Sequence, residues 1–408
     1  YIVAQWETPE GPQLITKAIN GVPVAARFPH PFDWFSPENG QKAYEMMSCY
    51  IGLLELYKVT HNAAYLDAVQ KTVNDIANTE INVAGSGSAF ESWYSGRKYQ
   101  TSPTYHTMET CVTFTWIQLC DKLLALTGNP FYADQIEKSL YNALMAALKD
   151  DASQIAKYSP MEGHRCEGEE QCGMHINCCN ANGPRAFALI PDFAVKKMGN
   201  EVYVNYYGDM SASLENGHNK VLVKQHTTYP VSNVIDITID VTKENVFGLH
   251  LRVPVWSAQT VITLNGEELK DICPGTYHAI TRKWKKGDHI QIILDMPARL
   301  LEQNQMQAIV RGPIVLARDS RFNDGFVDET LVVDSEDGIV KAEVDSVPGF
   351  AWMRLKVPVT VGTDLEGVGM YRNISFCDFA SAGNTWDKQV RYRVWIPRTL
   401  DVKKGHLK

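Results

Sequence analysis

The chain has 408 residues, of which 45% are hydrophobic and 21% are charged, and its formal net charge is −8 at pH 7. A chain of this length is too long to fold around one typical hydrophobic core, which indicates two or three domains. The acidic balance gives no reason to expect nucleic-acid binding, and no apolar run is long enough to span a membrane.

The N-terminal residues Tyr1 to Trp6 have neither the basic start nor the long apolar stretch of a signal peptide. The chain opens as if inside a helical region, so we expect the natural protein to continue on the N-terminal side. A removed signal peptide would then be invisible. The compartment stays open, with a periplasmic or secreted location slightly favoured over the cytoplasm.

Residues 1–197 show mainly helical periodicity. Apolar residues recur at three- and four-residue steps through 41–57 and 65–77, which predicts an antiparallel helix pair. Residues 107–126 and 132–148 predict a second pair. Repeated helix pairs indicate a helical barrel or solenoid, and two pairs are too few to close a barrel.

After about residue 197 the hydrophobic period changes to two. Short runs rich in branched and aromatic residues predict strands at 201–207, 220–223, 234–239, 248–253, 261–264 and 289–294. We expect residues 198–318 to form a β-sandwich and residues 319–408 to form a further C-terminal β domain.

Two neighbouring cysteines, Cys178 and Cys179, are the first candidates for function. They cannot easily bond to each other, because a disulfide between adjacent residues is strained. Asn180 or Asn182 can cap a helix with Pro184 in its first turn, and the start of that helix favours a thiolate. A thiolate is both a metal ligand and a nucleophile.

Glu109 and Cys111 complete a candidate metal site with this pair. Three thiolates and one carboxylate suit tetrahedral zinc. Residues two apart on a regular helix point to nearly opposite sides, so this segment must be extended or lie at a loosened helix start. The alternative is that Cys111 packs in the core and Glu109 is an ordinary first-turn carboxylate.

Further candidates lie in and beside two long irregular segments, 85–100 and 158–179, which are rich in polar aromatic residues. The candidates for contacting a ligand are His106, His175, Trp93, Tyr158 and Gln100. Each has an alternative as an ordinary structural residue. Cys166 and Cys172 also lie near the cysteine pair, and the sequence does not decide between a disulfide and free thiols.

Several motifs occur together in this chain. They are Glu109-Thr110-Cys111, Asn177-Cys178-Cys179-Asn180 followed by Pro184-Arg185, Leu251-Arg252-Val253-Pro254-Val255-Trp256, Asn265-Gly266, Arg282-Lys283-Trp284-Lys285-Lys286-Gly287-Asp288 and Arg311-Gly312-Pro313. The combination resembles glycoside hydrolase family 127, the β-L-arabinofuranosidase-like enzymes, over most of the chain. The resemblance implies an α+β multidomain fold, in which an (α/α)6 barrel, partial in this chain, precedes β-sandwich domains.

The resemblance also implies roles for the four metal-site candidates. Glu109, Cys111, Cys178 and Cys179 would hold a zinc ion, and Cys178 would attack the anomeric carbon to form a thioglycosyl intermediate. Water would then release the sugar with retained configuration. Zinc and a helix terminus would keep the attacking thiol ionised at neutral pH.

The acid/base residue departs from the family pattern, which places a glutamate just before an Ala-Phe pair. Ser88 stands at that place, and Glu91 follows shortly after the pair. Glu91 is therefore the expected group that protonates the leaving oxygen and later activates water. The alternative is that Glu91 is an ordinary loop carboxylate and that another group does this work.

The expected activity is release of an L-arabinofuranose-type sugar from plant glycans, with Zn²⁺ as cofactor and an oligosaccharide as partner. Two alternatives stay open: hydrolysis of a branched acidic furanose in pectin side chains, for which Arg97 is a candidate contact, and non-catalytic carbohydrate binding with structural zinc. A zinc amidohydrolase is disfavoured, because four protein ligands leave no position for water. Whether the chain forms a homodimer is open.

Overall fold

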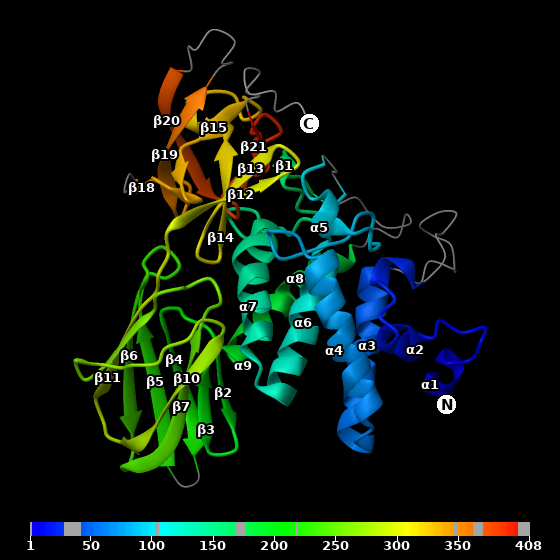
Figure 1. The fold of residues 1–408 in the computed structure, drawn as a ribbon, viewed down its shortest axis with the longest axis vertical. Helices are drawn as coiled ribbons and strands as arrows, with labels where there is room; N and C mark the ends of the chain where they lie inside the picture. Colours follow the sequence, from blue (N-terminus) through cyan, green and yellow to red (C-terminus); the bar gives the residue numbers. More distant parts are fainter. Residues whose placement is uncertain are drawn as a thin grey trace.

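The computed structural model describes residues 2–27, 42–102, 106–167, 177–216, 219–345, 349–361 and 370–398. Helices occupy most of the first half and sheets most of the second (Figure 1). The mixed helix-and-sheet, multidomain character expected from the sequence is therefore confirmed. Within the described ranges, no helix is both long and apolar enough to cross a membrane.

Both predicted helix pairs are present. The first consists of α3 (Ala43–Thr60) and α4 (Ala63–Thr79), and the second of α6 (Thr110–Thr127) and α7 (Pro130–Ser139). Each second helix starts at an asparagine cap: Asn62 accepts from the Ala64 N–H, and Asn129 accepts from the Phe131 N–H. The remaining helical elements are α1 (Ile2–Trp6), α2 (Leu14–Ile19), η1 (Val24–Ala26), α5 (Gly96–Tyr99), η2 (Leu140–Leu144), α8 (Cys178–Ala188), α9 (Ile190–Ala194) and η3 (Ser320–Phe322).

The helix α6 lies at the centre of the helical region. It contacts α3, α7 and α8, and nearly every residue of its first two turns is buried. Trp116 and Leu119 of this helix belong to one hydrophobic cluster with Tyr50 and Leu54 of α3. A helix that is apolar all round is a buried helix, so the start of α6 is a rigid position for a functional group.

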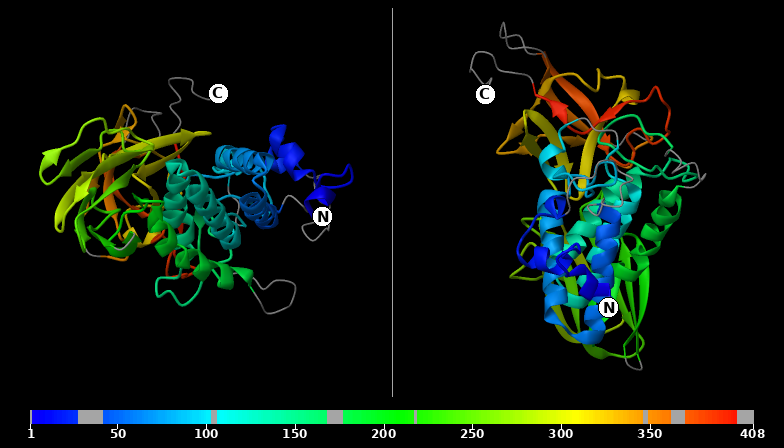
Figure 2. Two further views of the ribbon diagram at one scale, coloured as in Figure 1. Left: turned by 90° about the horizontal axis from the view of Figure 1, so that it is seen from below. Right: turned by 90° about the vertical axis from the view of Figure 1, so that its right-hand side faces the viewer.

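Two sheets follow the helices and share one hydrophobic core. The first contains β2 (Val195–Met198), β3 (Glu201–Val204), β7 (Asn245–Val253) and β10 (Thr276–Trp284). The second contains β4 (Met210–Asn216), β5 (Asn219–His226), β6 (Val234–Val241), β8 (Val261–Leu264), β9 (Glu267–Glu268) and β11 (Asp288–Ile293). Ile237 of β6 and Leu249 of β7 lie in the same buried cluster. Figure 2 shows the sheets on one side of the helices and the N-terminal helices on the far side.

A third sheet contains the later strands together with β1 (Glu162–Gly163). Its strands are β12 (Ala298–Gln303), β13 (Met306–Arg311), β14 (Ile314–Asp319), β15 (Leu331–Val333), β16 (Ser335–Glu336), β17 (Ile339–Val340), β18 (Glu343–Val344), β19 (Arg354–Val361), β20 (Met370–Asp378), β21 (Tyr392–Arg393) and β22 (Ile396–Pro397). The expected boundary at residue 318 therefore falls inside one sheet, because β14 pairs both with β13 and with β20. These pairings favour a boundary between β11 and β12.

The third sheet is fastened to a loop of the helical region. The short strand β1 pairs with β21, and the two lie side by side in Figure 1. The Tyr392 hydroxyl donates to the Pro160 carbonyl at 2.6 Å, and Arg393 forms an ion pair with Glu162 at 3.1 Å. The loop that carries Tyr158 is thus held by a C-terminal strand.

Candidate active site

The two motif segments meet at the starts of α6 and α8. Glu109 precedes α6 in an extended conformation, with φ −58° and ψ 135°, so the helix begins only after it. Cys178 is the first residue of α8, and the Asn177 side chain accepts from the Cys179 N–H at 3.0 Å. The expectation of a cap at Asn180 or Asn182 was wrong, because Asn177 caps the helix earlier and both lie inside it. Pro184, expected in the first turn, likewise lies in the helix interior.

Glu109, Cys111, Cys178 and Cys179 form a compact cluster. Each offers one ligand atom, and these atoms all lie within 4.8 Å of one another. The Cys111 Sγ is 3.0 Å from the Cys178 Sγ and 3.3 Å from the Cys179 Sγ. Both Cys178 Sγ and Cys179 Sγ lie 3.7 Å from Glu109 Oε1. The structure therefore brings together the four residues that the sequence singled out, in a group that can hold a metal ion.

The four groups differ in their access to solvent. Cys179, Cys111 and Glu109 are 0%, 2% and 3% exposed, whereas Cys178 is only partly buried. A nucleophile must be reached by its substrate, and a structural ligand need not be. Among these sulfurs, the Cys178 Sγ belongs to the most accessible residue.

The ionisable groups of the cluster shift one another's pKa. Hydrogen bonds with Cys111 and Cys179 lower the pKa of the Cys178 thiol, and contacts within the same cluster raise the pKa of the other two thiols. Burial raises the pKa of Glu109 well above its usual range, with the charges of Glu91 and Cys178 adding to the effect. The protein alone thus favours one thiolate, at Cys178, whereas a divalent cation would let all four groups ionise.

Asn182 supports the cluster from one turn along α8, a role that sequence reasoning missed. Its amide N–H donates to the Cys111 Sγ at 3.1 Å, and its carbonyl accepts from Arg185 at 2.8 Å. Such partners orient metal ligands and tune their affinity. The available signal was spacing, because Asn182 lies four residues after Cys178 and so shares its helix face.

Glu91 lies beside the cluster, between Lys42 and Lys157. Sequence reasoning did not predict either lysine contact. Its carboxylate oxygens are 2.9 Å from Lys42 Nζ and 2.9 Å from Lys157 Nζ. Burial raises the pKa of Glu91, but the hydrogen bonds and charges of Lys157 and Lys42 outweigh it, so the pKa lies below its usual range. Ser88, by contrast, is fully buried, and its hydroxyl has no hydrogen-bond partner in the described part of the chain.

His106 and Tyr158 lie together next to Glu91. The His106 ring stacks on Phe90, with centroids 4.5 Å apart, and meets the edge of Tyr158 at 5.2 Å. Tyr158 also pairs through its backbone with Glu109. Tyr158 therefore borders the cysteine cluster, and His106 lies beside the turn that carries Glu91.

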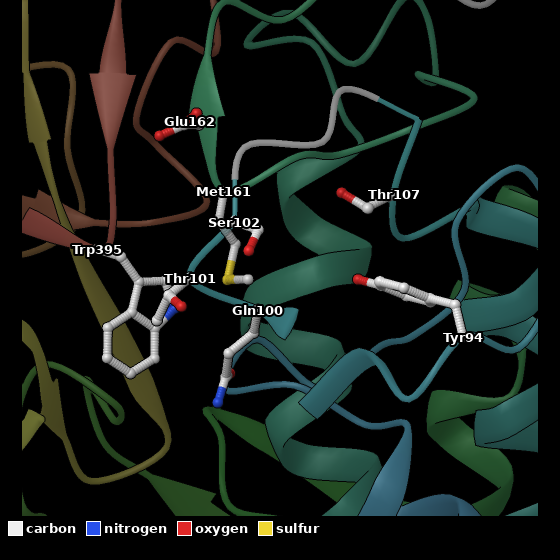
Figure 3. A pocket seen from close by; sticks show the side chains of 8 residues that line it. All are labelled: Tyr94, Gln100, Thr101, Ser102, Thr107, Met161, Glu162 and Trp395. Carbon is white, nitrogen blue, oxygen red and sulfur yellow. The ribbon is translucent and has the colours of Figure 1, made fainter. Parts of the chain in front are cut away.

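Trp93 and Gln100 make structural contacts in the described part of the chain. Trp93 is 2% exposed and belongs to the hydrophobic cluster of the helices, so its ring face is covered. The Gln100 amide accepts from the Val83 N–H at 2.9 Å and donates to Gln303 at 2.6 Å. Gln100 lines a small polar pocket with Tyr94 and Trp395 (Figure 3). His175, and Cys172 as the expected neighbour of Cys166, lie outside the described residues.

Comparison with known proteins assigns the chain to a family. Residues 36–192 match the catalytic domain of "Beta-L-arabinofuranosidase, GH127", and residues 201–296 match its middle domain. The chain belongs to glycoside hydrolase family 127. The catalytic-domain match contains all four residues of the cluster and Glu91.

Three GH127 proteins compared with this chain have low sequence identity to it. A non-reducing end β-L-arabinofuranosidase of Bifidobacterium longum subsp. longum is 24% identical over 245 residues, which are 53% of this chain and 36% of that protein. A GH127 β-L-arabinofuranosidase from Geobacillus stearothermophilus T6 superposes with a TM-score of 0.78 at 18% identity, covering 96% of this chain and 67% of that one. Another GH127 β-arabinofuranosidase superposes with a TM-score of 0.77 at 21% identity, covering 96% of this chain and 65% of that one. The chain thus spans about a third of the curated relative and about two thirds of these structures, which share its fold.

Proposed function

We propose that this chain carries the catalytic site of a retaining glycoside hydrolase that releases an L-arabinofuranose-type sugar from plant glycans. The observation that carries the proposal is the partly exposed Cys178 thiol in a cluster of three cysteines and one glutamate, with the Glu91 carboxylate beside it. Membership of GH127 supports the reaction class. The relative described as a non-reducing end β-L-arabinofuranosidase supports the sugar class.

Zn²⁺ is the metal that best fits this donor set. Three sulfurs and one carboxylate oxygen match the ligand types and the ligand number of tetrahedral zinc sites. Glu109, Cys111, Cys178 and Cys179 would hold it, and Asn182 would orient Cys111. When bound, zinc supplies the positive charge that keeps the thiols ionised at neutral pH.

In the first step, the Cys178 sulfur attacks the anomeric carbon and the bond to the leaving oxygen breaks. Glu91 gives a proton to that oxygen, so the sugar is left bonded to the Cys178 sulfur. Glu91 must be protonated for this role, whereas its two lysines favour the carboxylate. Lys42 is the more exposed partner, with 19% of its side chain accessible against 4% for Lys157. We therefore propose that substrate displaces Lys42 and thereby raises the pKa of Glu91.

In the second step, Glu91 acts as the base. Its carboxylate takes a proton from water, the water oxygen attacks the anomeric carbon, and the carbon–sulfur bond breaks. Two displacements at one carbon return the original configuration. The lysine contacts that oppose the first step favour this one, because they stabilise the ionised carboxylate.

The finer architecture belongs to the same proposal. We propose that the helix pairs α3–α4 and α6–α7 are part of an (α/α)6 barrel and that the two sheets with a shared core form a β-sandwich. In this proposal the helical domain comprises residues 1–197. The boundary between the two β domains lies between β11 and β12 instead of at residue 318. The TM-scores with GH127 structures support this arrangement.

One experiment tests the proposed function directly. The purified protein is assayed for bound zinc and for hydrolysis of aryl β-L-arabinofuranosides, and the anomeric configuration of the first product is read by NMR. We expect bound zinc, hydrolysis and retention. Cys178→Ala should abolish turnover, whereas Cys49→Ala, which changes a partly buried cysteine outside the cluster, should not. Sugar binding without hydrolysis would instead indicate a carbohydrate-binding protein, and inversion would exclude the thioglycosyl route.

A further inference from the structure

The turn that carries Glu91 has an unusual composition. Ala89 and Ser92 exchange two backbone hydrogen bonds, of 2.9 and 3.0 Å, which close a turn with Phe90 and Glu91 at its centre. Both central residues have positive φ, 47° for Phe90 and 70° for Glu91. Turns that require positive φ at both positions favour Asn-Gly, because side chains with a Cβ are strained there.

The surroundings hold this strained turn in place. The Phe90 N–H donates to the His106 carbonyl at 2.9 Å, and the Glu91 carbonyl accepts from the Ala43 N–H at 2.8 Å. Strained backbone persists only where the rest of the fold determines it, and it gathers at functional sites. The proposed acid/base role accounts for the presence of Glu91 at one central position of the turn. It does not account for Phe90 at the other.

Phe90 is placed as a ring that a ligand can reach. Its side chain is 52% exposed although it is large and apolar. One face stacks on His106 at an interplanar angle of 22°, and His106 is in turn braced edge-on by Tyr158. The three rings pack against one another, and Phe90 is the most exposed of them.

We infer that Phe90 is a substrate-binding residue that stacks on the sugar of the leaving group. Sugar rings present apolar C–H faces, and aromatic side chains are common walls of ligand sites. Phe90 is adjacent to Glu91, and in the proposed reaction Glu91 lies on the side of the leaving oxygen, opposite the Cys178 sulfur. The ring therefore contacts the departing sugar, not the one that becomes bonded to Cys178. This inference rests on the proposed function and deepens it, because it makes the enzyme selective for a sugar on the leaving side.

The test compares two leaving groups in the zinc-loaded protein. An arabinofuranosyl disaccharide offers a sugar that can stack, whereas β-L-arabinofuranosyl fluoride offers none. Phe90→Ala should lower kcat/KM for the disaccharide by roughly tenfold, the order expected for one aromatic stacking contact. On the fluoride, kcat/KM of the same variant should stay within about twofold of the wild-type value, because a fluoride leaving group makes no stacking contact that the substitution could remove. Phe90→Tyr should restore the disaccharide rate.

The controls separate this inference from folding and from the proposed function. Phe326→Ala removes another exposed phenylalanine, 83% exposed and in the C-terminal sheet region, and should change neither rate. Thermal melting of each variant checks that the turn still folds. An equal loss on both substrates, or no loss on the disaccharide, would overturn the role of Phe90 alone. A folded, zinc-loaded wild-type protein that cleaves neither substrate would overturn the proposed function and this inference with it.

Discussion

Lys157 joins the two halves of the candidate site, because its ammonium lies 2.9 Å from Glu91 Oε1 while its backbone carbonyl accepts from the Thr110 N–H. The same carbonyl is 3.8 Å from the Cys179 Sγ. One residue therefore fixes the proposed acid/base relative to the cysteine cluster. Its side chain is 4% exposed, so the ion pair with Glu91 is largely shielded from water.

Removing Lys157 should destabilise the protein more than removing Lys42. Lys157→Met leaves a buried carboxylate with one partner fewer, which costs about 3–5 kcal/mol for a buried pair. Lys42→Met should cost less, because the Lys42 side chain is 19% exposed and water can replace it. Urea unfolding at pH 7 measures both. Equal costs would show that the Lys157 pair is not effectively buried.

The cost of Lys157→Met should shrink as the pH falls. The lysines lower the folded pKa of Glu91 below its unfolded value, so their stabilisation is present above the unfolded pKa and is lost as the pH falls through the folded one. Below that pH, Glu91 is protonated in both proteins and needs no cation. We therefore expect the difference in unfolding free energy between wild type and Lys157→Met to be full at pH 7 and to shrink as the pH falls through the lowered folded pKa of Glu91. A constant difference would contradict the ion-pair explanation.

Substrates with different leaving groups should show whether Glu91 or Glu45 is the catalytic acid. Glu45 lies in the first turn of α3, and burial raises its pKa, with the charges of Glu91 and Cys178 among the smaller contributions. Glu91→Gln should slow substrates with poor leaving groups by about 10²–10⁴-fold, the usual contribution of general acid catalysis, and aryl substrates with good leaving groups much less. Glu45→Gln is the matched control and should affect both alike. The reverse pattern would assign the acid to Glu45.

Asn182 should control metal affinity. Asn182→Ala removes the hydrogen bond to Cys111 and should weaken zinc binding by about 10–100-fold, the usual effect of losing such a supporting contact. Competition with a chromophoric chelator measures this affinity. Asn180→Ala changes an exposed asparagine of the same helix and should leave the zinc affinity unchanged. Similar effects of both variants would point to the helix as a whole and not to the Cys111 contact.

Arg252 should be essential for joining the helices to the sheets. It is fully buried on β7, where it forms ion pairs with Asp134 and Glu137 of α7. Arg252→Met leaves two buried carboxylates unpaired and should cost at least about 3–5 kcal/mol. Arg299→Met breaks a half-exposed pair with Asp295 and should cost less than about 1 kcal/mol. Chemical unfolding of both variants makes the comparison, and similar costs would contradict the importance of burial.

The cysteine cluster could be predicted because its evidence is local. Glu109, Cys111 and the cysteine pair have side chains whose chemistry suggests a metal by type alone, and their motifs are short. The lysines around Glu91 carry no such signal. Lys42 is 49 residues away from Glu91, and surface-type residues are normally read as solvated. Only the folded chain shows that both ammonium groups are turned inward.

The remaining differences from the sequence expectations have similar causes. Asn177, Asn180 and Asn182 are all acceptable caps by residue type, and only the structure shows that the helix begins after Asn177. Trp93 occurs in a loop with polar aromatic residues, but the fold turns its ring into the helical core. Strands alternate in the same way on both sides of residue 318, while sheet membership depends on long-range pairing, so the pairing of β14 with both β13 and β20 could not be predicted from the sequence.

The pairing of β1 with β21 has a consequence for the order of events on the ribosome. The loop around Pro160 leaves the exit tunnel long before Tyr392, yet its hydrogen bond needs the Tyr392 hydroxyl. The residues of the helices and of the cysteine cluster are synthesised before this contact can form, because the contact needs β21. A nascent chain halted before β21 would already contain the four residues of the cysteine cluster, but it would lack the Tyr392 contact that holds the loop next to Tyr158.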